Sequence, residues 1–247
     1  MSRRSVYALS LSTFALVLAF TNCGLPTPIQ NEAESNLNTP AEVAPVTGTP
    51  APAAPESDIT KIAGLYNSGG SLQVVFPDGE FWSYGGYGII QMRHGKILSA
   101  KDGAYQLNYL VGQGAGTTVN GTYVAGTSLG SATYLASSKT PASVAGAAGD
   151  WWGNLQDGDT PYLNFSNTGV ISGFSANFSC RFSGRLEPHP SGLNVLKITI
   201  TRANCLGSGQ SEVFTGIARV AGGGGAIHFV ALNAAKTRVL TWEGYPD

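Results

Sequence analysis

Charge is scarce in this chain, and neither sign dominates. Asp, Glu, Lys and Arg make up only 12% of the 247 residues, and the formal net charge is −1. A large share of nucleic-acid affinity comes from phosphates that Lys and Arg neutralise. Four basic residues gather between positions 181 and 202, but no basic stripe runs along the chain. We therefore expect no nucleic-acid partner.

Histidine and cysteine are also rare, with three of each. No two cysteines have the C-x-x-C spacing of a redox or zinc motif, and no histidine stands at ligand spacing from a cysteine. His94, His189 and His228 lie in separate segments, and the sequence fixes no carboxylate partner for any of them. We therefore expect no metal site, no Ser-His-Asp triad and no cofactor.

Two short motifs suggest chemistry but lack its context. GTSLG at residues 126–130 fits the G-x-S-x-G pattern, which needs a strand, a sharp elbow at the serine and then a helix. Here strand-like sequence stands on both sides, so we interpret Ser128 as part of a hairpin turn and expect no enzyme. Asp157 and Asp159 in DGD could bind Ca²⁺, but the long EF-hand loop with its terminal Glu is missing, which favours a turn.

The longest apolar run stands at the N-terminus. Residues 6–20 read VYALSLSTFALVLAF, a run of fifteen residues that follows Arg3 and Arg4. Such a run is too short to span a bilayer comfortably, but it is typical of a secretory signal. Residues 1–22 are therefore predicted to be a signal peptide.

The end of this run resembles the lipobox of bacterial lipoproteins. Thr21, Asn22 and Cys23 follow Phe20, where the family usually has Leu, and Asn22 stands where Gly, Ala or Ser is usual. The resemblance implies cleavage before Cys23 and acyl chains on it, each contributing about 0.8 kcal/mol per buried methylene to membrane binding. Gly24 in place of Asp implies the outer membrane, on either its periplasmic or its surface face. The alternative is ordinary signal cleavage that leaves Cys23 as a spare thiol.

Residues 23–58 differ from the rest of the chain in composition. They hold seven of the thirteen prolines and no aromatic residue. Such a segment cannot bury enough apolar surface to offset its ordering entropy, and proline keeps it extended. We predict a disordered linker that spaces a folded domain from the membrane, although a generic disordered tail has the same composition.

Residues 59–247 have the pattern of an all-β fold. Short alternating runs such as SLQVVF, AYQLNYLV and VLKITITR recur every eight to twelve residues and are separated by glycine-bearing turns. No long window shows the apolar period of a helix. We therefore expect antiparallel strands throughout.

The β-rich part also repeats itself. FPDGEF at residues 76–81 resembles FSNTGVI at 165–171, and residues 120–136 align without a gap on 215–231, which places GTSLG on AGGGG. We predict two related halves, residues 59–145 and 146–247, each of seven or eight strands. They form either two small barrels or one larger barrel or sandwich. The composition and strand pattern of this part resemble those of the barrel lobes of bacterial surface lipoproteins such as the transferrin-binding type, with no shared motif.

The remaining cysteines, Cys180 and Cys205, bracket a hairpin in the second half only. The turn HPSG at residues 189–192 lies between them. An even pair of cysteines in an exported protein indicates a disulfide. We predict this bond, with Cys23 left out of it.

Two function classes fit these features. The first is a binding or structural lipoprotein of the outer membrane, held there by its lipid and acting on an unknown protein or envelope partner. The second is a small-ligand carrier that uses the mouth of a barrel. Its candidate residues are aromatic, and core packing is the alternative role for them: Trp82, Tyr84, Tyr87, Trp151 and Trp152. Whether the barrel interior is filled separates the two classes.

Overall fold

The structure is a computed structural model that describes residues 58–85, 92–111 and 116–247. The predicted signal peptide, the lipid anchor at Cys23 and nearly all of the predicted linker lie outside the described residues, as does Tyr87. Within the described ranges, no helix has the length and apolar character needed to cross a membrane.

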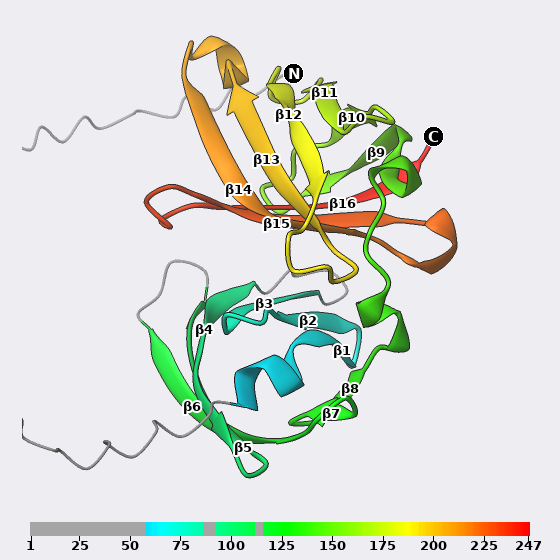
Figure 1. Ribbon diagram of the computed structural model, residues 1–247. Helices are drawn as coiled ribbons and strands as arrows, with labels where there is room; N and C mark the ends of the chain where they lie inside the picture. The colour runs from blue at the N-terminus through cyan, green and yellow to red at the C-terminus, as the bar shows by residue number, and fades with distance from the viewer. Residues whose placement is uncertain (1–57, 86–91, 112–115) are drawn as a thin grey trace, which may run out of the picture. The chain divides into compact units, whose positions relative to one another are not determined.

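The first half forms a closed antiparallel barrel of eight strands, shown in cyan and green in Figure 1. It is called barrel 1 below. Strands follow each other around the barrel in sequence order, and β8 closes it by pairing with β1 through Tyr66↔Tyr134 and Asn67↔Thr133. Its elements are η1 (Asp58–Ile62), β1 (Gly64–Ser68), β2 (Ser71–Val75), β3 (Glu80–Gly85), β4 (Arg93–Lys101), β5 (Ala104–Val111), β6 (Thr117–Val124), β7 (Ser128–Leu129) and β8 (Ala132–Tyr134).

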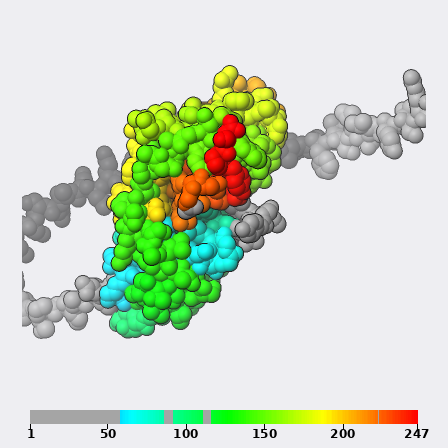
Figure 2. All heavy atoms as spheres, turned by 90° about the vertical axis from the view of Figure 1, so that its right-hand side faces the viewer, coloured from blue at the N-terminus to red at the C-terminus, as the bar shows by residue number. Residues whose placement is uncertain are grey.

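The second half forms a second closed barrel of eight antiparallel strands, barrel 2, which β16 closes on β9. Figure 2 shows the C-terminal residues, in red, on the molecular surface. The elements after barrel 1 are η2 (Ala136–Lys139), η3 (Val144–Ala147), β9 (Gly149–Leu155), β10 (Pro161–Phe165), β11 (Val170–Ser175), β12 (Arg181–Pro188), β13 (Leu196–Ala203), η4 (Cys205–Gly207), β14 (Ser211–Val220), η5 (Gly222–Gly224), β15 (Ile227–Asn233) and β16 (Val239–Pro246). The all-β prediction is confirmed, and of the architectures left open the two small barrels are the ones observed.

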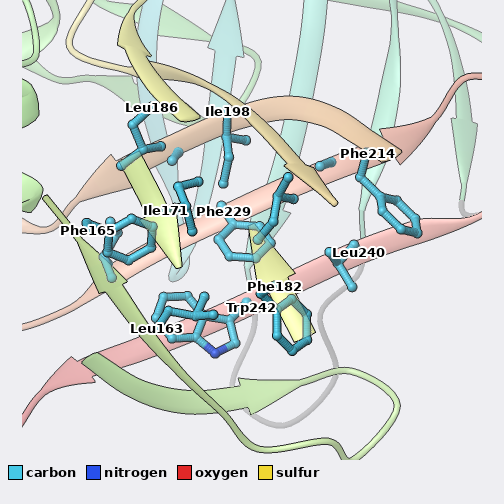
Figure 3. Close-up of a cluster of buried hydrophobic side chains, with 14 of the residues drawn as sticks. Leu163, Phe165, Ile171, Phe182, Leu186, Ile198, Phe214, Phe229, Leu240 and Trp242 are labelled. Atoms are coloured by element: carbon cyan, nitrogen blue, oxygen red, sulfur yellow. The ribbon is translucent and has the colours of Figure 1, made fainter. Parts of the chain in front are cut away.

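Side chains fill the interior of barrel 2. Strand β13 illustrates the alternation: Leu196, Ile198 and Ile200 are fully buried, whereas Lys197 between them is exposed. Figure 3 shows the large side chains that meet in this core, where the rings of Phe229 and Trp242 stack with their centroids 5.4 Å apart. The interior is a packed core of apolar residues contributed by all eight strands and η3.

Barrel 1 is filled in the same way. Ile62 of the 3₁₀ helix η1 enters the core, and the hydroxyl of Tyr66 donates to the Ile62 carbonyl at 2.7 Å. Burial raises the pKa of Tyr66 to about 12, so this hydroxyl remains a donor at neutral pH. Inward residues from later strands, including Ile97, Leu107 and Leu129, complete the packing.

A third apolar cluster joins outer faces of the two barrels. Leu72, Val74, Trp82 and Tyr84 point outward from β2 and β3, since their neighbours Val75 and Phe81 point into barrel 1. They pack against outward residues of β14 and β15 and of the loop before β13: Ile217, Val230, Leu232, Leu193 and Val195. Strands β2 and β3 are therefore buried on both faces.

Equivalent details in the two barrels confirm the predicted repeat. Gly79 and Gly169 occupy the same turn, with φ of 88° and 85°, and their carbonyls accept from Ile97 and Leu186 at 2.8 and 2.7 Å. This turn has a positive φ that disfavours other residues. The indole of Trp151 donates to the Ala147 carbonyl at 3.0 Å, four residues back, as Tyr66 does in barrel 1.

One part of the sequence alignment is wrong. It placed residues 132–136 on 227–231, which equates β8 with β15. The strand order makes β8 the eighth strand of barrel 1 and β15 the seventh of barrel 2. The reason is that β7 has only two residues, so barrel 1 fits two strands into the length that β15 alone takes in barrel 2.

The predicted disulfide is present. Cys180 and Cys205 are bonded with their Cα atoms 4.1 Å apart. The hairpin prediction is confirmed as well, because β12 pairs with β13 from Arg181↔Ala203 to Pro188↔Leu196. The bond lies at the open end of this hairpin.

Candidate functional site

The predicted aromatic residues of barrel 1 lie in the contact between the barrels. Trp82 is buried, its Nε1 donates to Glu80 Oε1 at 2.9 Å, and its ring centroid lies 4.3 Å from that of His94. Tyr84 is also buried and packs in the same cluster. Core packing therefore accounts for Trp82, and Tyr84 belongs to a pocket described below.

The two predicted tryptophans of barrel 2 lie on opposite sides of β9. Trp151 points into the core, whereas 47% of Trp152 is exposed on the outer face. The structure therefore does not bring the predicted aromatic residues together into one site.

Trp152 belongs to a row of outward aromatic side chains across four adjacent strands, of which three are exposed and Tyr162 is half-buried. It pairs with Tyr245 of β16 on one side and Tyr162 of β10 on the other, and Tyr162 pairs with Phe174 of β11. Ring centroids are 6.0 Å apart for Trp152 and Tyr245 and 6.2 Å apart for Tyr162 and Phe174. Phe174 is 57% exposed and Tyr245 39% exposed. These four residues are called the aromatic row below.

A row of small polar residues runs beside it. Asp150, Asn164, Ser172 and Ser183 are paired across β9 to β12, two residues along each strand from the aromatic row or its continuation at Arg181. The Asn164 amide donates to Asp150 Oδ1 at 2.6 Å. An open groove of about 980 Å³ lies over the part of the two rows on β10, β11 and β12, and its lining includes Tyr162, Phe174, Asn164, Ser172, Ser183 and Arg181.

Two tyrosine hydroxyls of the aromatic row contact carboxylates. Tyr162 donates to Asp247 Oδ2 at 3.4 Å, and Tyr245 donates to Glu243 Oε1 at 2.6 Å. Desolvation, followed by the charges of Asp150 and Asp247, raises the pKa of Tyr162. The hydroxyl therefore stays protonated at neutral pH, and these bonds help to orient both rings.

A second candidate site is a pocket of about 370 Å³ lined by residues of both barrels. Barrel 2 supplies a row of polar residues, because Arg219 of β14 pairs with His228 of β15 and His228 pairs with Glu243 of β16. His228 Nε2 lies 3.9 Å from Glu243 Oε1. Residues of barrel 1 in the lining include Asn67 and Tyr84.

Two residues that line the pocket each have a buried polar atom without a hydrogen-bond partner in the described ranges. Arg219 Nε is buried and has no hydrogen-bond partner among the described residues, and the same is true of Nε1 of Trp242, whose ring lines the pocket. Buried donors are normally paired, so an unpaired arginine nitrogen is unusual. Burial lowers the pKa of His228, with Glu243 opposing the effect, and burial raises the pKa of Tyr84. At neutral pH the cationic group of this pocket is therefore Arg219.

The GTSLG motif does not form the strand, elbow and helix that the hydrolase pattern requires. Ser128 begins the two-residue strand β7, where it pairs with Val124 and Thr133, and strand β8 follows in place of a helix. Ser128 thus lies next to the turn at residues 125–127 rather than inside it. Among the residues that the structure describes, no group of His, Cys, Asp and Glu could hold a metal ion.

The DGD motif forms the predicted turn and also supports the disulfide hairpin. Gly158 has φ of 84°, and the carboxylates on either side bind one guanidinium. Arg202 donates to Asp157 Oδ2 at 2.6 Å and to the fully buried Asp159 at 3.1 Å. Its Nε also lies 3.2 Å from Cys180 Sγ. The two acids therefore hold an arginine.

The histidines have partners that the sequence did not reveal. His94 Nε2 lies 3.0 Å from Glu80 Oε1 on the neighbouring strand β3. The ring of His189 stacks on Phe76 of barrel 1 at 4.1 Å between centroids. His228 lines the pocket with Arg219. No two of the three histidines form a catalytic pair in these contacts.

Sequence reasoning missed Tyr162, Phe174 and Tyr245 of the aromatic row. A signal was present, because each occupies an outward position of an alternating strand: Tyr162 stands beside the inward Leu163, and Tyr245 follows the inward Trp242 by three residues. What the sequence lacked was the register that aligns them. Arg219 carried no signal beyond its place in an alternating run.

No protein family, no curated protein and no solved structure matches this chain.

Proposed function

We propose that this chain is a non-catalytic binding lipoprotein, held at the outer membrane of a bacterium through acyl chains on Cys23. Its ligand or partner binds on the outer surface of barrel 2. The observation that carries this proposal is the aromatic row, exposed on a barrel whose own interior is already packed. The linker of residues 23–58 spaces the barrels from the membrane.

The energetics favour a binding role for the row. Exposed apolar patches that gather on one surface of a soluble protein commonly mark interaction sites, whereas single exposed apolar residues are ordinary. Tyr, Trp and Phe are enriched at interfaces, where one rigid ring buries a large area with little loss of side-chain entropy. Four such rings on adjacent strands form a platform rather than a scatter.

Site-specific photo-crosslinking in cells tests this proposal. A photoreactive residue in place of Trp152 should yield discrete adducts with an envelope component. The matched control is Lys197, which is exposed on β13 of the same barrel but lies outside the row. Absence of adducts at position 152, or the same adducts at both positions, would overturn the proposal.

The anchor has its own test. Cys23→Ser should move the protein from the membrane to the soluble fraction, and intact-mass measurement of the mature wild type should show acyl chains on its N-terminal residue. A mature protein that begins elsewhere without acylation would refute the lipid anchor and leave the binding surface to be judged by crosslinking.

A second candidate function is a small-ligand carrier, and the pocket beside Arg219 favours it. The ligand would be an anion whose oxygen accepts from Arg219 Nε, with His228 and Tyr84 on the pocket wall. Native mass spectrometry of protein purified from its host should then show a retained small molecule. Arg219→Gln should release it, whereas Arg181→Gln, on β12 and outside the lining of this pocket, should not.

A further inference from the structure

Equivalent outer faces of the two barrels differ in how far other parts of the protein cover them. The register that aligns Tyr245, Trp152, Tyr162 and Phe174 on barrel 2 aligns Thr133, Asn67, Leu72 and Tyr84 on barrel 1. On barrel 1, Leu72 and Tyr84 are buried against β14 and β15 of barrel 2. The part of this row on β2 and β3 is therefore covered in barrel 1, although Asn67 and Thr133 are exposed. Its counterpart on barrel 2 is not covered, since Phe174 is exposed and Tyr162 is half-buried.

A second copy of the chain does not fit the exposed row by the same packing. The surface that receives barrel 1 is apolar and includes Ile217 and Val230. Its counterpart on barrel 1 is the outer face of β6, where the exposed Thr118, Asn120 and Thr122 are polar. Repeating the contact between copies would place aromatic rings on this polar strand. The occupant therefore has different chemistry.

The charged groups around the row disfavour a polyanionic occupant. Arg181 is the cation at one end, whereas the carboxylates of Asp150, Glu243 and Asp247 lie along or beside the rings. Nucleic acid needs several cations for its phosphates, and an anionic membrane surface needs a basic cluster. The remaining polar side chains of the groove carry hydroxyls and two amides, which suit neutral hydrogen-bonding partners.

We propose that the aromatic row and its groove bind a neutral polysaccharide of the cell envelope, which deepens and rests on the proposed function. A pyranose ring has a C–H face that packs on an aromatic ring and a rim of hydroxyls. The rings of Trp152 and Phe174 supply the flat apolar surface. Asn164, Ser172 and Ser183, one row away, supply donors and acceptors for the rim.

The spacing suits an extended chain. Ring centroids are 6.0 Å apart for Trp152 and Tyr245 and 6.2 Å apart for Tyr162 and Phe174, and the four rings lie on four adjacent strands. Adjacent strands are about 4.8 Å apart, close to the length of one sugar unit, so successive sugars of one chain reach successive rings. Affinity should therefore rise with the number of sugars until the row is covered.

The test uses the full-length mature lipoprotein in detergent micelles and an array of neutral oligosaccharides of two to six sugars. The wild type should bind at least one series, with affinity increasing at least tenfold from two sugars to four. Trp152→Ala and Phe174→Ala should each weaken binding at least tenfold, and Trp152→Phe should retain most of it. Leu98→Ala is the matched control, because Leu98 is 53% exposed on barrel 1 away from the row, and it should bind as the wild type does.

Three results would overturn the glycan inference: no neutral oligosaccharide bound, binding that Trp152→Ala leaves unchanged, or binding to anionic vesicles or polyanions alone. Crosslinking at position 152 distinguishes this failure from that of the proposed function. Protein adducts there without glycan binding would retain the binding surface and reject the polysaccharide. Absence of both adducts and glycan binding would reject both.

Discussion

The two barrels share a plan but differ most where each one closes. Barrel 1 closes with β7 and β8, of two and three residues, whereas barrel 2 closes with β15 and β16, of seven and eight. The longer strands extend the outer face that carries Val230 and Leu232, and that face receives barrel 1. The comparison teaches that strand length at the closure decides which copy of a repeat offers a broad apolar surface.

The barrels also fill one equivalent position with different pairs of residues. Barrel 1 uses Tyr66 with Ile62, and barrel 2 uses Trp151 with Ala147. The larger ring accompanies the smaller partner, so the gain in volume from Tyr to Trp partly offsets the loss from Ile to Ala. Both rings donate to the carbonyl four residues back. Packing density in cores is nearly constant, which makes such paired exchanges favourable.

The largest expected difference between the barrels comes from Phe165 and its counterpart Val75. Both are buried and stand at the end of the second strand of their barrel, before the shared turn. Phe165→Ala should lower the free energy of unfolding by about 3–5 kcal/mol, because it removes a whole ring from a packed core. Val75→Ala should have a clearly smaller effect. Denaturant unfolding followed by tryptophan fluorescence measures both, and equal losses would contradict the larger contribution assigned to the ring of Phe165.

The disulfide is the next largest asymmetry, because barrel 1 contains no cysteine. Replacing Cys180 and Cys205 together by Ala should lower stability by at most about 3–4 kcal/mol, the chain-entropy value for a loop of this length. The effect should be confined to barrel 2, where Arg202 also contacts Cys180. Hydrogen exchange should show faster opening of β12 and β13 and unchanged protection in β4 and β5. Faster hydrogen exchange throughout barrel 1 would show that the disulfide stabilises both barrels.

A smaller effect is expected from acid, through histidines at the contact between the barrels. Burial lowers the pKa of His189 below 6.5 despite Glu80 and Asp78, and burial lowers that of His228 despite Glu243. The unfolded chain therefore binds protons at higher pH than the native one. Stability should be fully present above about pH 6.5 and should fall as pH drops through the native pKa values.

Thermal unfolding between pH 7.5 and 5 measures this dependence. A variant with His189→Gln and His228→Gln should show a flatter profile than the wild type in that range. The pKa of Glu80 is lowered chiefly by its hydrogen bond with His94. Its contribution to stability is therefore lost at a lower pH than that of the two histidines. An unchanged slope in the double variant would mean that these histidines do not set the acid response.

The smallest expected effect is that of Ser128→Ala. The side chain lies on the short strand β7, which does not have the strand, turn and helix arrangement of a nucleophile elbow. Stability and ligand binding should both match the wild type within error. Labelling of Ser128 by a fluorophosphonate probe would contradict the absence of a nucleophile.

Much of the fold could be predicted from local patterns. Alternation predicted long strands such as β5 and β13, and turn residues predicted the shared turn at Gly79 and Gly169. The pairing of Cys180 with Cys205 followed from the single hairpin that they bracket, with Cys23 assigned to the lipid. The very short strand β7 could not be predicted, because two residues cannot show a period, and the ungapped alignment consequently shifted by one strand.

The candidate site was predicted only in part, for a related reason. Tyr84 and Trp152 were named, but the sequence could not say that one lines a pocket and the other stands exposed. Their local patterns are alike, since both are outward aromatic residues on strands of small barrels. The difference depends on what covers each face, and that is decided by residues far away in the chain.

The sequence alone determined the strand alternation, the two-fold repeat and the disulfide, because each depends on residues near one another in the chain or on composition. Three features depend on long-range packing: the halves close as separate barrels, Leu72 and Tyr84 are covered, and Trp152 joins a row of outward aromatic residues. Barrel closure and register are set by hydrogen bonds and packing between distant strands. A face of the repeat is therefore buried or exposed according to the neighbour it meets, and the same local pattern serves both outcomes.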